Sequence, residues 1–236
     1  GAGGGIVADS QPEAEYRECL LKTRVLTMER LAFRLLETMR WEAGGGFYLL
    51  EEHLARMREA ARYFEVPFNE DAVRRTLCAR ASAWQRRDRR VRLLVDARGR
   101  PTVEAALLPA ERSTRERRVT FARKPVRSDD PFLCHKTTHR AVYDRALAGR
   151  TGVDDVLLWN ERGEVTESTI ANLVVVLDGR RVTPPLACGL LPGLFRQRLL
   201  AEGIVCERIL TCEEVAGADA LFLVNSVRGW MPARMV

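Results

Sequence analysis

Lys136 is the residue of this sequence best suited to covalent chemistry. The chain has 236 residues and 38 lysines and arginines, of which only Lys22, Lys124 and Lys136 are lysines. Arginine is therefore its ordinary surface cation, and a lone lysine in the half-apolar stretch 132–140 needs another explanation. An ammonium group can lose its proton when desolvated and then attack a carbonyl carbon, which a guanidinium cannot do. Taken alone, a surface lysine whose stem packs on apolar neighbours would remain the simpler interpretation.

Residues further along the chain supply what a lysine-bound pyridoxal 5′-phosphate requires. That cofactor needs an amine, a carboxylate beside its pyridine nitrogen, and backbone N–H groups at a helix N-terminus for its phosphate, usually with an arginine. Lys136 can supply the amine and Glu167 the carboxylate. A Gly/Pro-rich loop ends at Gly193, where a helix is expected, and this phosphate cup can be closed by Ser226 and Arg56. We therefore predict pyridoxal 5′-phosphate as the cofactor.

Composition limits the class of protein. With 46% hydrophobic residues, the chain can bury a sizeable core as one large or two small domains. Its net charge of +6 raises the question of nucleic acid, but the arginines are spread among 32 acidic residues. The run 85–90 has no interleaved aromatics, so we interpret it as a solvated helix end leading into a strand. We expect no nucleic-acid partner, and a basic surface would suit anionic substrates.

The cysteines and the apolar segments indicate the compartment. Six cysteines are scattered without a C-x-x-C pair, which favours free thiols in a reducing cytosol over a disulfide frame or a zinc site. No apolar run approaches the length of a membrane span, and the N-terminus lacks the pattern of a signal peptide. His135 and His139 lie four residues apart, but no carboxylate or cysteine completes a metal site. We expect a cytoplasmic protein without a membrane partner or a metal.

The periodicity of residues 31–115 predicts a small α+β subdomain. Alternating residues favour a hairpin, the next segments have helical spacing with Asn69 as a cap, and a second hairpin follows. The expected strands are 33–41, 47–50, 91–96 and 101–108, the expected helices are 51–64 and 69–87, and the linker is 109–118.

Residues 116–236 predict a larger α/β subdomain with the Lys136 loop near its start. Short strands separated by turns alternate with a few helices, and no internal repeat is present. The expected strands are 118–124, 154–159, 164–166, 173–177, 181–183, 204–210 and 220–224, and the expected helices are 138–148, 194–202 and 212–216.

Four motifs in the right order make residues 32–236 resemble the fold-type IV pyridoxal-phosphate enzymes. They are His53-Leu54-Ala55-Arg56, Lys136, Glu167 followed by Asn172, and Leu191-Pro192-Gly193 with Arg196. The resemblance implies an α+β fold with the cofactor between two α/β subdomains, a homodimer, and catalysis by Lys136 and Glu167. It implies that the cofactor is bound by Arg56, Lys136, Glu167, Asn172, Gly193, Leu194, Phe195, Asn225 and Ser226.

Residues 1–30 resemble the C-terminal end of chorismate-utilising enzymes such as aminodeoxychorismate synthase. In that family a helix glutamate holds Mg²⁺ and a lysine one turn on faces the substrate, and Glu18 and Lys22 match by position. The match covers only the end of such a domain, so this site is incomplete here. The resemblance implies a fused chain with a missing synthase domain and a glutamine amidotransferase subunit as a partner. Alternatively, 12–26 is an amphipathic helix that packs on the rest of the chain.

Within the fold-type IV group, two features favour a lyase. The ending at Asn225-Ser226 looks like that of aminodeoxychorismate lyase, where aminotransferases usually carry Gly-Thr, and the joined tail resembles the enzyme that makes the lyase's substrate. The resemblance implies conversion of 4-amino-4-deoxychorismate to 4-aminobenzoate and pyruvate in folate biosynthesis. Thr38, Arg40 and Arg228 are the expected substrate contacts, since a dianion suits a guanidinium.

Two other functions stay open, and two positions depart from the family. The chain could be an aminotransferase of branched-chain or D-amino acids, or a remnant domain that no longer binds a cofactor. Aminotransferases carry a tyrosine five residues after the lysine, where this chain has Ala141 and places Tyr143 two residues later. They often carry threonine at the position of Phe195, so one hydroxyl contact to the phosphate is missing.

Overall fold

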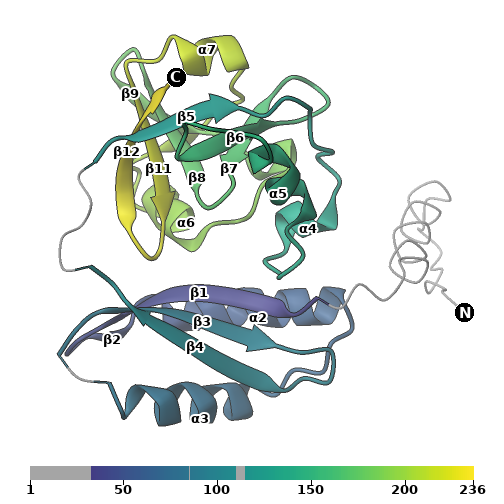
Figure 1. The fold of residues 1–236 in the computed structure, drawn as a ribbon, viewed down its shortest axis with the longest axis vertical. Coiled ribbons are helices and arrows are strands. Elements are labelled where there is room, and N and C mark those ends of the chain that lie inside the picture. Colours follow the sequence, from purple (N-terminus) through teal and green to yellow (C-terminus); the bar gives the residue numbers. More distant parts are fainter. Residues whose placement is uncertain (1–32, 85, 110–114) are drawn as a thin grey trace, which may run out of the picture.

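The computed structural model describes residues 33–84, 86–109 and 115–236, which form two sheets with helices packed on them (Figure 1). The expected helix 12–26 and the two matched positions Glu18 and Lys22 lie outside the described residues. Among the described residues, no helix is long and apolar enough to cross a membrane.

The first sheet has four antiparallel strands in the order β2-β1-β3-β4. Helices α2 and α3 pack on one of its faces, and the core between them contains Leu35, Met39, Leu54 and Leu77. The elements are β1 (Leu35–Glu42), β2 (Gly46–Phe47), α2 (Leu50–Tyr63), α3 (Glu70–Ala81), β3 (Arg89–Val95) and β4 (Pro101–Leu107).

Alternation along β1 and β3 decides which side chains face the helices. Odd-numbered residues such as Met39 and Val91 are fully buried in the helix-side core. Even-numbered residues point to the opposite face, because successive side chains of a strand alternate. The register pairs Thr38 with Arg92 and Arg40 with Arg90, so this second face carries polar and cationic groups.

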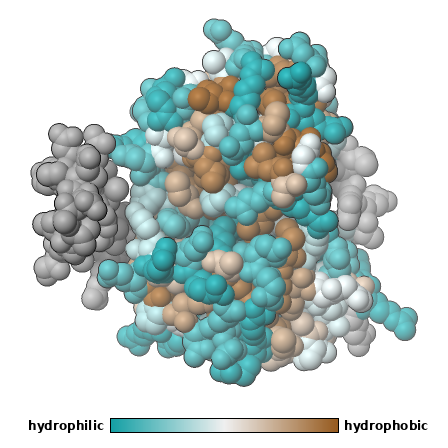
Figure 2. All heavy atoms as spheres, turned by 180° about the vertical axis from the view of Figure 1, so that it is seen from behind, coloured by the Kyte–Doolittle hydropathy of each residue, from teal (hydrophilic) through white to brown (hydrophobic). Residues whose placement is uncertain are grey.

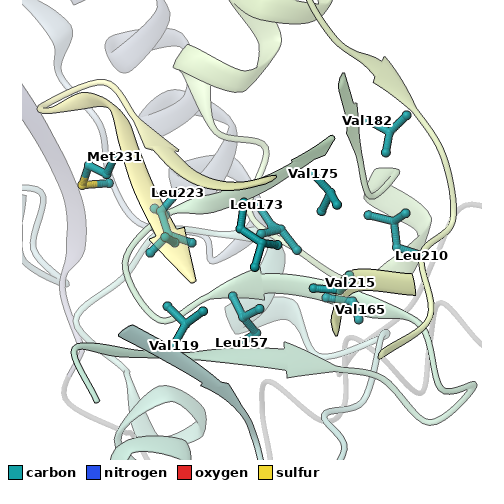
Figure 3. Close-up of a cluster of buried hydrophobic side chains, with 13 residues drawn as sticks. Val119, Leu157, Val165, Leu173, Val175, Val182, Leu210, Val215, Leu223 and Met231 are labelled. Carbon is teal, nitrogen blue, oxygen red and sulfur yellow. The ribbon is translucent and has the colours of Figure 1, made fainter. Parts of the chain in front are cut away.

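The second sheet has eight strands in the order β10-β9-β8-β11-β12-β5-β6-β7, and β7 also pairs with β8. This extra pairing closes six of the strands into a ring around an apolar core that includes Val119, Leu157, Leu173 and Leu223 (Figure 3). The elements are β5 (Arg117–Phe121), α4 (Pro131–Cys134), α5 (Ala141–Leu147), β6 (Asp155–Trp159), β7 (Val165–Ser168), β8 (Asn172–Leu177), β9 (Arg180–Thr183), η1 (Leu186–Cys188), α6 (Leu194–Ala201), β10 (Cys206–Glu207), α7 (Cys212–Ala216), β11 (Ala220–Asn225) and β12 (Gly229–Met235).

The Lys136 loop joins the two sheets. The Leu36 N–H donates to the Lys136 carbonyl at 3.0 Å, and the Thr138 N–H donates to the Arg34 carbonyl at 2.9 Å. Leu35 and Thr137 form an antiparallel bridge. The loop therefore extends the start of β1 by one short pairing, which fixes the backbone on both sides of the lysine.

Most expected elements are present, with shifted ends. The Asn69 cap is confirmed, since its side chain accepts from the Ala72 N–H at 2.9 Å. The helix it starts ends at Ala81 rather than at residue 87, because Trp84 turns back and packs on Trp41 with ring centroids 5.4 Å apart. The described residues 86–90 contain no helix, so the expected helix end is wrong there, whereas the expected strand is present because β3 begins at Arg89.

The C-terminal half holds the larger differences. The expected strand 204–210 was wrong in length, since only Cys206–Glu207 pairs, with β9. Helix α4, the turn η1 and strand β12 were not anticipated. Pro232 argues against a strand from sequence, because proline lacks the donor for a ladder hydrogen bond. Even so, β12 pairs with both β11 and β5 and thereby links the two halves of the second sheet.

Candidate active site

A pocket of about 370 Å³ lies between the two sheets. The first sheet contributes Thr38 from β1, while the second contributes Glu167 from β7 and the start of α6 at Gly193. Lys136 enters from the loop between α4 and α5, and Ser226 from the turn between β11 and β12. Groups that are far apart in sequence therefore meet in one cavity.

Lys136 is partly exposed, and its exposure is toward this pocket. Desolvation inside the fold and, second, the positive charge of Arg56 lower the pKa of its ammonium group to about 8, against the opposing charges of Glu37 and Glu167. An ammonium with that pKa is partly deprotonated at neutral pH, unlike an ordinary surface lysine. Lys136 can therefore act as a nucleophile or as a base.

Glu167 is the second titratable group of the pocket and is only 3% exposed. Its carboxylate accepts hydrogen bonds from Tyr143 Oη at 2.9 Å, from the Leu191 N–H at 3.2 Å and from Asn172 Nδ2 at 3.2 Å. Burial raises the pKa of Glu167 to about 7, although the first two donors act in the opposite direction. No cation bonds to it among the described residues, so an incoming positive charge would find an unpaired acid.

Gly193 lets the α6 end of the pocket close around Asn172. It precedes α6 with a φ of −67°, which any residue adopts, so the reason for glycine is steric. A Cβ there would lie 1.8 Å from Asn172 Oδ1. The first turn of α6 leaves backbone N–H groups without intrahelical partners, including those of Leu194 and Phe195, which is the usual geometry for an anion. The Phe195 ring turns away and packs on Trp230, so only its backbone could serve.

Arg56 reaches the pocket from α2 and is held by a buried glutamate that sequence reasoning missed. Its Nε and Nη2 donate to Glu37 at 2.8 and 2.6 Å, and its Nη1 donates to the Pro192 carbonyl at 2.8 Å. Burial would raise the pKa of Glu37, but the charge of Arg56 and hydrogen bonds from His53 and Arg56 lower it to about 2. Glu37 could have been found as the single acid on the core-facing side of β1, between Leu35 and Met39.

His53 completes this network. Its Nδ1 lies 2.7 Å from Glu37 Oε2, its side chain is fully buried, and its Nε2 has no partner. Burial lowers the pKa of the imidazole, so the neutral ring donates its Nδ1–H to Glu37. Local packing and hydrogen bonding therefore account for this histidine.

Of the three residues expected to contact the substrate, two line the pocket. Thr38 and Arg228 line the pocket, whereas Arg40 does not. Beside the pocket, Arg40 Nη2 lies 2.6 Å from Glu42 Oε1. Arg40 Nη1 donates to the Val227 carbonyl at 3.4 Å. This pairing leaves its guanidinium with fewer free donors, and a substrate contact of Arg40 stays a prediction.

Asn225 and Ser226 line the pocket and shape the turn between β11 and β12. Asn225 Oδ1 accepts from the backbone N–H groups of Val227 and Arg228, at 3.1 and 2.9 Å. Ser226 Oγ lies 3.5 Å from the Thr38 carbonyl, which brings this turn against the first sheet.

Tyr143 lies two residues after the position where aminotransferases carry a tyrosine. It nevertheless lines the pocket, where its hydroxyl donates a hydrogen bond to Glu167. The neighbouring histidines pack on aromatic rings: His135 lies 4.4 Å from Tyr63, and His139 lies 4.3 Å from Phe132, between ring centroids. In the part of the chain that the structure describes, no group of three His, Cys, Asp or Glu side chains is arranged to hold a metal ion.

Comparison with known proteins decides the family. The family model described as amino-transferase class IV matches residues 34–236. The chain belongs to the amino-transferase class IV family. Its fold is that of the fold-type IV pyridoxal-phosphate enzymes, as the sequence motifs predicted. A second model, chorismate binding enzyme, matches residues 1–28.

Individual class IV relatives carry two kinds of name. The chain is 29% identical over 202 residues to a Schizosaccharomyces pombe protein named "Putative aminodeoxychorismate lyase", covering 82% of this chain and 86% of that one. It is 31% identical over 195 residues to a Thermotoga maritima protein named "Probable branched-chain-amino-acid aminotransferase", covering 78% and 70%. A crystal structure of a Mesorhizobium loti protein, called an amino-acid aminotransferase with the qualifier "Putative", superposes with a TM-score of 0.81 at 36% identity, covering 86% of this chain and 100% of that one.

Class IV enzymes use pyridoxal 5′-phosphate, and the pocket has the donor set for it. Lys136 offers a depressed-pKa amine and Glu167 an unpaired carboxylate for the pyridine nitrogen. Backbone N–H groups after Gly193, with Arg56 bonded to the adjoining Pro192 carbonyl, offer an anion site for the phosphate. The residues present therefore fit the cofactor.

Proposed function

We propose that this protein is a 4-amino-4-deoxychorismate lyase, which converts 4-amino-4-deoxychorismate to 4-aminobenzoate and pyruvate in folate biosynthesis. The observation that carries the proposal is the chorismate-binding match at residues 1–28, directly before the class IV region in the same chain. A synthase tail joined to this domain fits an enzyme that consumes the synthase product. The similarity to the Schizosaccharomyces pombe protein adds support.

Five of the predicted residues then have a task in holding the cofactor. Lys136 would hold it covalently, Glu167 would lie against its pyridine nitrogen, and Arg56 with the N–H groups after Gly193 would bind its phosphate. Asn172 would keep Glu167 in place through its 3.2 Å hydrogen bond. When bound, the cofactor supplies an electron sink for the carbanion chemistry of the substrate.

The reaction needs one proton moved and one carbon–oxygen bond broken. The proton leaves C4, the carbon that carries the amine, and the bond between C3 and the enolpyruvyl oxygen breaks. The electron pair of that bond leaves with the oxygen, the ring becomes aromatic, and the proton ends on pyruvate. Lys136 is the group that we expect to take the proton from C4 and return it, because its pKa of about 8 suits proton transfer near neutral pH.

The pocket also suits the charge of this substrate. Its two carboxylates require cations, and Arg228 lines the cavity together with the hydroxyl of Thr38. Glu167 and Tyr143 are both buried, so little water would reach this side of the reacting centre.

The organisation of the chain is part of the proposal. Residues 1–30 would be the end of a synthase domain, 31–115 the small subdomain and 116–236 the large one. We further propose a cytoplasmic homodimer that works beside the missing synthase domain and its glutamine amidotransferase subunit. Support for self-association comes from apolar patches on the face shown in Figure 2, above all over the half that contains the eight-stranded sheet.

An aminotransferase is the second candidate, favoured by the 31% identity to the Thermotoga maritima protein. Such an enzyme would consume a branched-chain or D-amino acid and a keto acid, whereas the lyase needs no keto acid. A domain that binds no cofactor would be the third outcome.

The deciding experiment compares the chain loaded with pyridoxal 5′-phosphate with two lysine variants. Lys136→Ala should lower formation of 4-aminobenzoate and pyruvate by roughly 10²–10⁴-fold or more. Lys124→Ala is the matched control, because Lys124 is exposed and outside this pocket. Borohydride reduction followed by peptide mass spectrometry should place the cofactor on Lys136.

Other outcomes reject the lyase. Glutamate formed from 2-oxoglutarate and isoleucine, without 4-aminobenzoate from the chorismate derivative, would favour the aminotransferase. Absence of cofactor on any lysine would favour the remnant.

A further inference from the structure

The arginines that line the pocket differ in whether their charge is already neutralised. Arg56 is paired with Glu37, and Arg92 donates to Glu104 at 2.8 Å. Arg140 donates to the Thr169 carbonyl at 2.6 Å, and its guanidinium lies over the Tyr143 ring. Arg90 and Arg228 also line the pocket, yet no side-chain hydrogen bond or ion pair joins either of them to a described residue.

These two arginines come from opposite sides of the cavity. Arg90 lies on β3 in register with Arg40, on the face of the first sheet that is turned away from its helices. Arg228 lies in the turn between β11 and β12, which points toward the first sheet (Figure 1). The contact of Ser226 with the Thr38 carbonyl keeps the turn there.

Both side chains are exposed, whereas Glu167 is deeply buried. Arg90 and Arg228 therefore stand at the mouth of the pocket. They are close enough to act on each other electrostatically: burial, and then the positive charges of Arg117 and Arg90, lower the pKa of Arg228. Two neighbouring guanidinium groups without a counter-ion repel each other, and a carboxylate placed between them would remove that repulsion.

We infer that Arg90 and Arg228 form a carboxylate clamp at the pocket mouth, which binds the ring carboxylate of the substrate, opposite the amine. The inference rests on the proposed function for the identity of the substrate. With the amine directed to Lys136, the carboxylate on the far side of the six-membered ring points out of the pocket. A branched-chain amino acid has an apolar group there and would leave both guanidinium groups unpaired. The clamp thus selects an aromatic-type acid over an aliphatic substrate.

The test uses a pair of ligands that differ only in this charge, 4-aminobenzoate and its neutral analogue 4-aminobenzamide. Calorimetric titration of the cofactor-loaded protein should show tighter binding of 4-aminobenzoate. Arg90→Gln and Arg228→Gln should each weaken 4-aminobenzoate binding by about tenfold, the size expected for a charge-assisted hydrogen bond, and leave 4-aminobenzamide unchanged. Arg234→Gln is the control, since it removes one equal charge from β12, outside the pocket and paired with Glu116.

The clamp and the proposed function can fail separately. If the wild type binds both ligands equally, or if Arg90→Gln and Arg228→Gln retain its preference for the acid, the clamp is wrong. Loss of the preference in the variants establishes the clamp even if the wild type releases no 4-aminobenzoate, a result that would reject only the lyase. In an active enzyme, the two variants should raise KM for 4-amino-4-deoxychorismate and leave kcat nearly unchanged, because the carboxylate is remote from the reacting bonds.

Discussion

Two buried glutamates, one in each sheet, show how the same side chain can have opposite properties. Glu37 on β1 is 1% exposed and Glu167 on β7 is 3% exposed. Burial raises the pKa of both, but Glu37 is bound by the guanidinium of Arg56 and has a pKa of about 2. Among the described residues, the hydrogen-bond donors to Glu167 are all neutral, and its pKa is about 7.

The difference separates an ionised anchor from a carboxyl group that titrates near neutral pH. With a pKa of about 2, Glu37 is ionised at neutral and mildly acidic pH, and it fixes Arg56 at the edge of the pocket. Glu167 is close to half-protonated at neutral pH, so a positively charged ring nitrogen could bind it and shift its titration. Cation partners, rather than the depth of burial, decide which behaviour a carboxylate has.

The largest effect on stability is expected from Glu37→Leu. Removal of one partner of a buried ion pair leaves Arg56 uncompensated, which should lower the free energy of unfolding by about 3–5 kcal/mol. Urea denaturation measures this change. The double variant Glu37→Leu/Arg56→Met should recover most of the loss, because it leaves no unpaired charge.

Glu42→Ala is the matched control for this change. Glu42 lies on the same strand and is also paired with an arginine, Arg40, but its side chain is 37% exposed. Its removal should cost less than about 1 kcal/mol. A loss for Glu37→Leu as small as that of the control would show that Glu37 is no anchor.

For the protein without cofactor, Glu167→Gln should raise the free energy of unfolding at pH 8, whereas Glu37→Leu lowers it. The folded state holds the Glu167 proton up to a pKa of about 7, against 4.5 for an unperturbed carboxyl, so the folded wild type loses stability as pH rises from 4.5 to 7. The variant lacks that loss and should be more stable than the wild type at pH 8, by up to about 3 kcal/mol.

The pH dependence distinguishes the two glutamates most clearly. For Glu37 the folded pKa of about 2 lies below 4.5, so its contribution to stability is present above pH 4.5 and is lost as pH falls toward 2. Denaturation curves across pH should therefore give differences between wild type and variant that develop below pH 4.5 for Glu37→Gln and between 4.5 and 7 for Glu167→Gln. If the stability differences of both variants developed over the same pH range, the contrast between Glu37 and Glu167 would be wrong.

Gly193→Ala should disturb Glu167 through Asn172. The new Cβ would lie 1.8 Å from Asn172 Oδ1, so the amide that donates to Glu167 must move. Overpacking of this kind costs about 1–3 kcal/mol, and cofactor affinity should fall as well. Gly217→Ala is the control, since its Cβ would meet the Glu213 carbonyl at an ordinary 3.5 Å. In an Asn172→Ala background, Gly193→Ala should cause little further loss of unfolding free energy. If the loss is as large as in the wild type, the clash with Asn172 is not its cause.

The smallest effect is expected from Tyr143→Phe. Loss of the hydroxyl that donates to Glu167 should raise the pKa of Glu167 further and cost about 1 kcal/mol of unfolding free energy at pH 8. The same substitution in a Glu167→Gln background should cost less, because the carboxylate is no longer charged. Full additivity of the two changes would mean that Tyr143 stabilises the fold without acting on Glu167.

From the sequence, several residues that line the pocket and the order of most elements could be predicted. Lys136, Glu167, Asn172 and Gly193 were identified from residue type and motif spacing, because a given cofactor restricts which side chains can hold it. The hairpins and helices of the first sheet followed from local periodicity, which reflects which side of each element is buried.

Which groups meet across the pocket could not be predicted from the sequence, because it depends on contacts between residues far apart in the chain. Strand alternation put Arg90 and Glu37 on opposite faces of the first sheet, but nothing local showed that one face met Arg228 and the other Arg56. Thr138 bonds to Arg34 across 104 residues, and such long-range pairing is what brings Lys136 to the first sheet. The pKa values of Glu37 and Glu167 depend on these non-local neighbours, and so the sequence pointed to Glu167 through its motif but did not reveal Glu37 or the opposite pKa shifts of the two carboxyl groups.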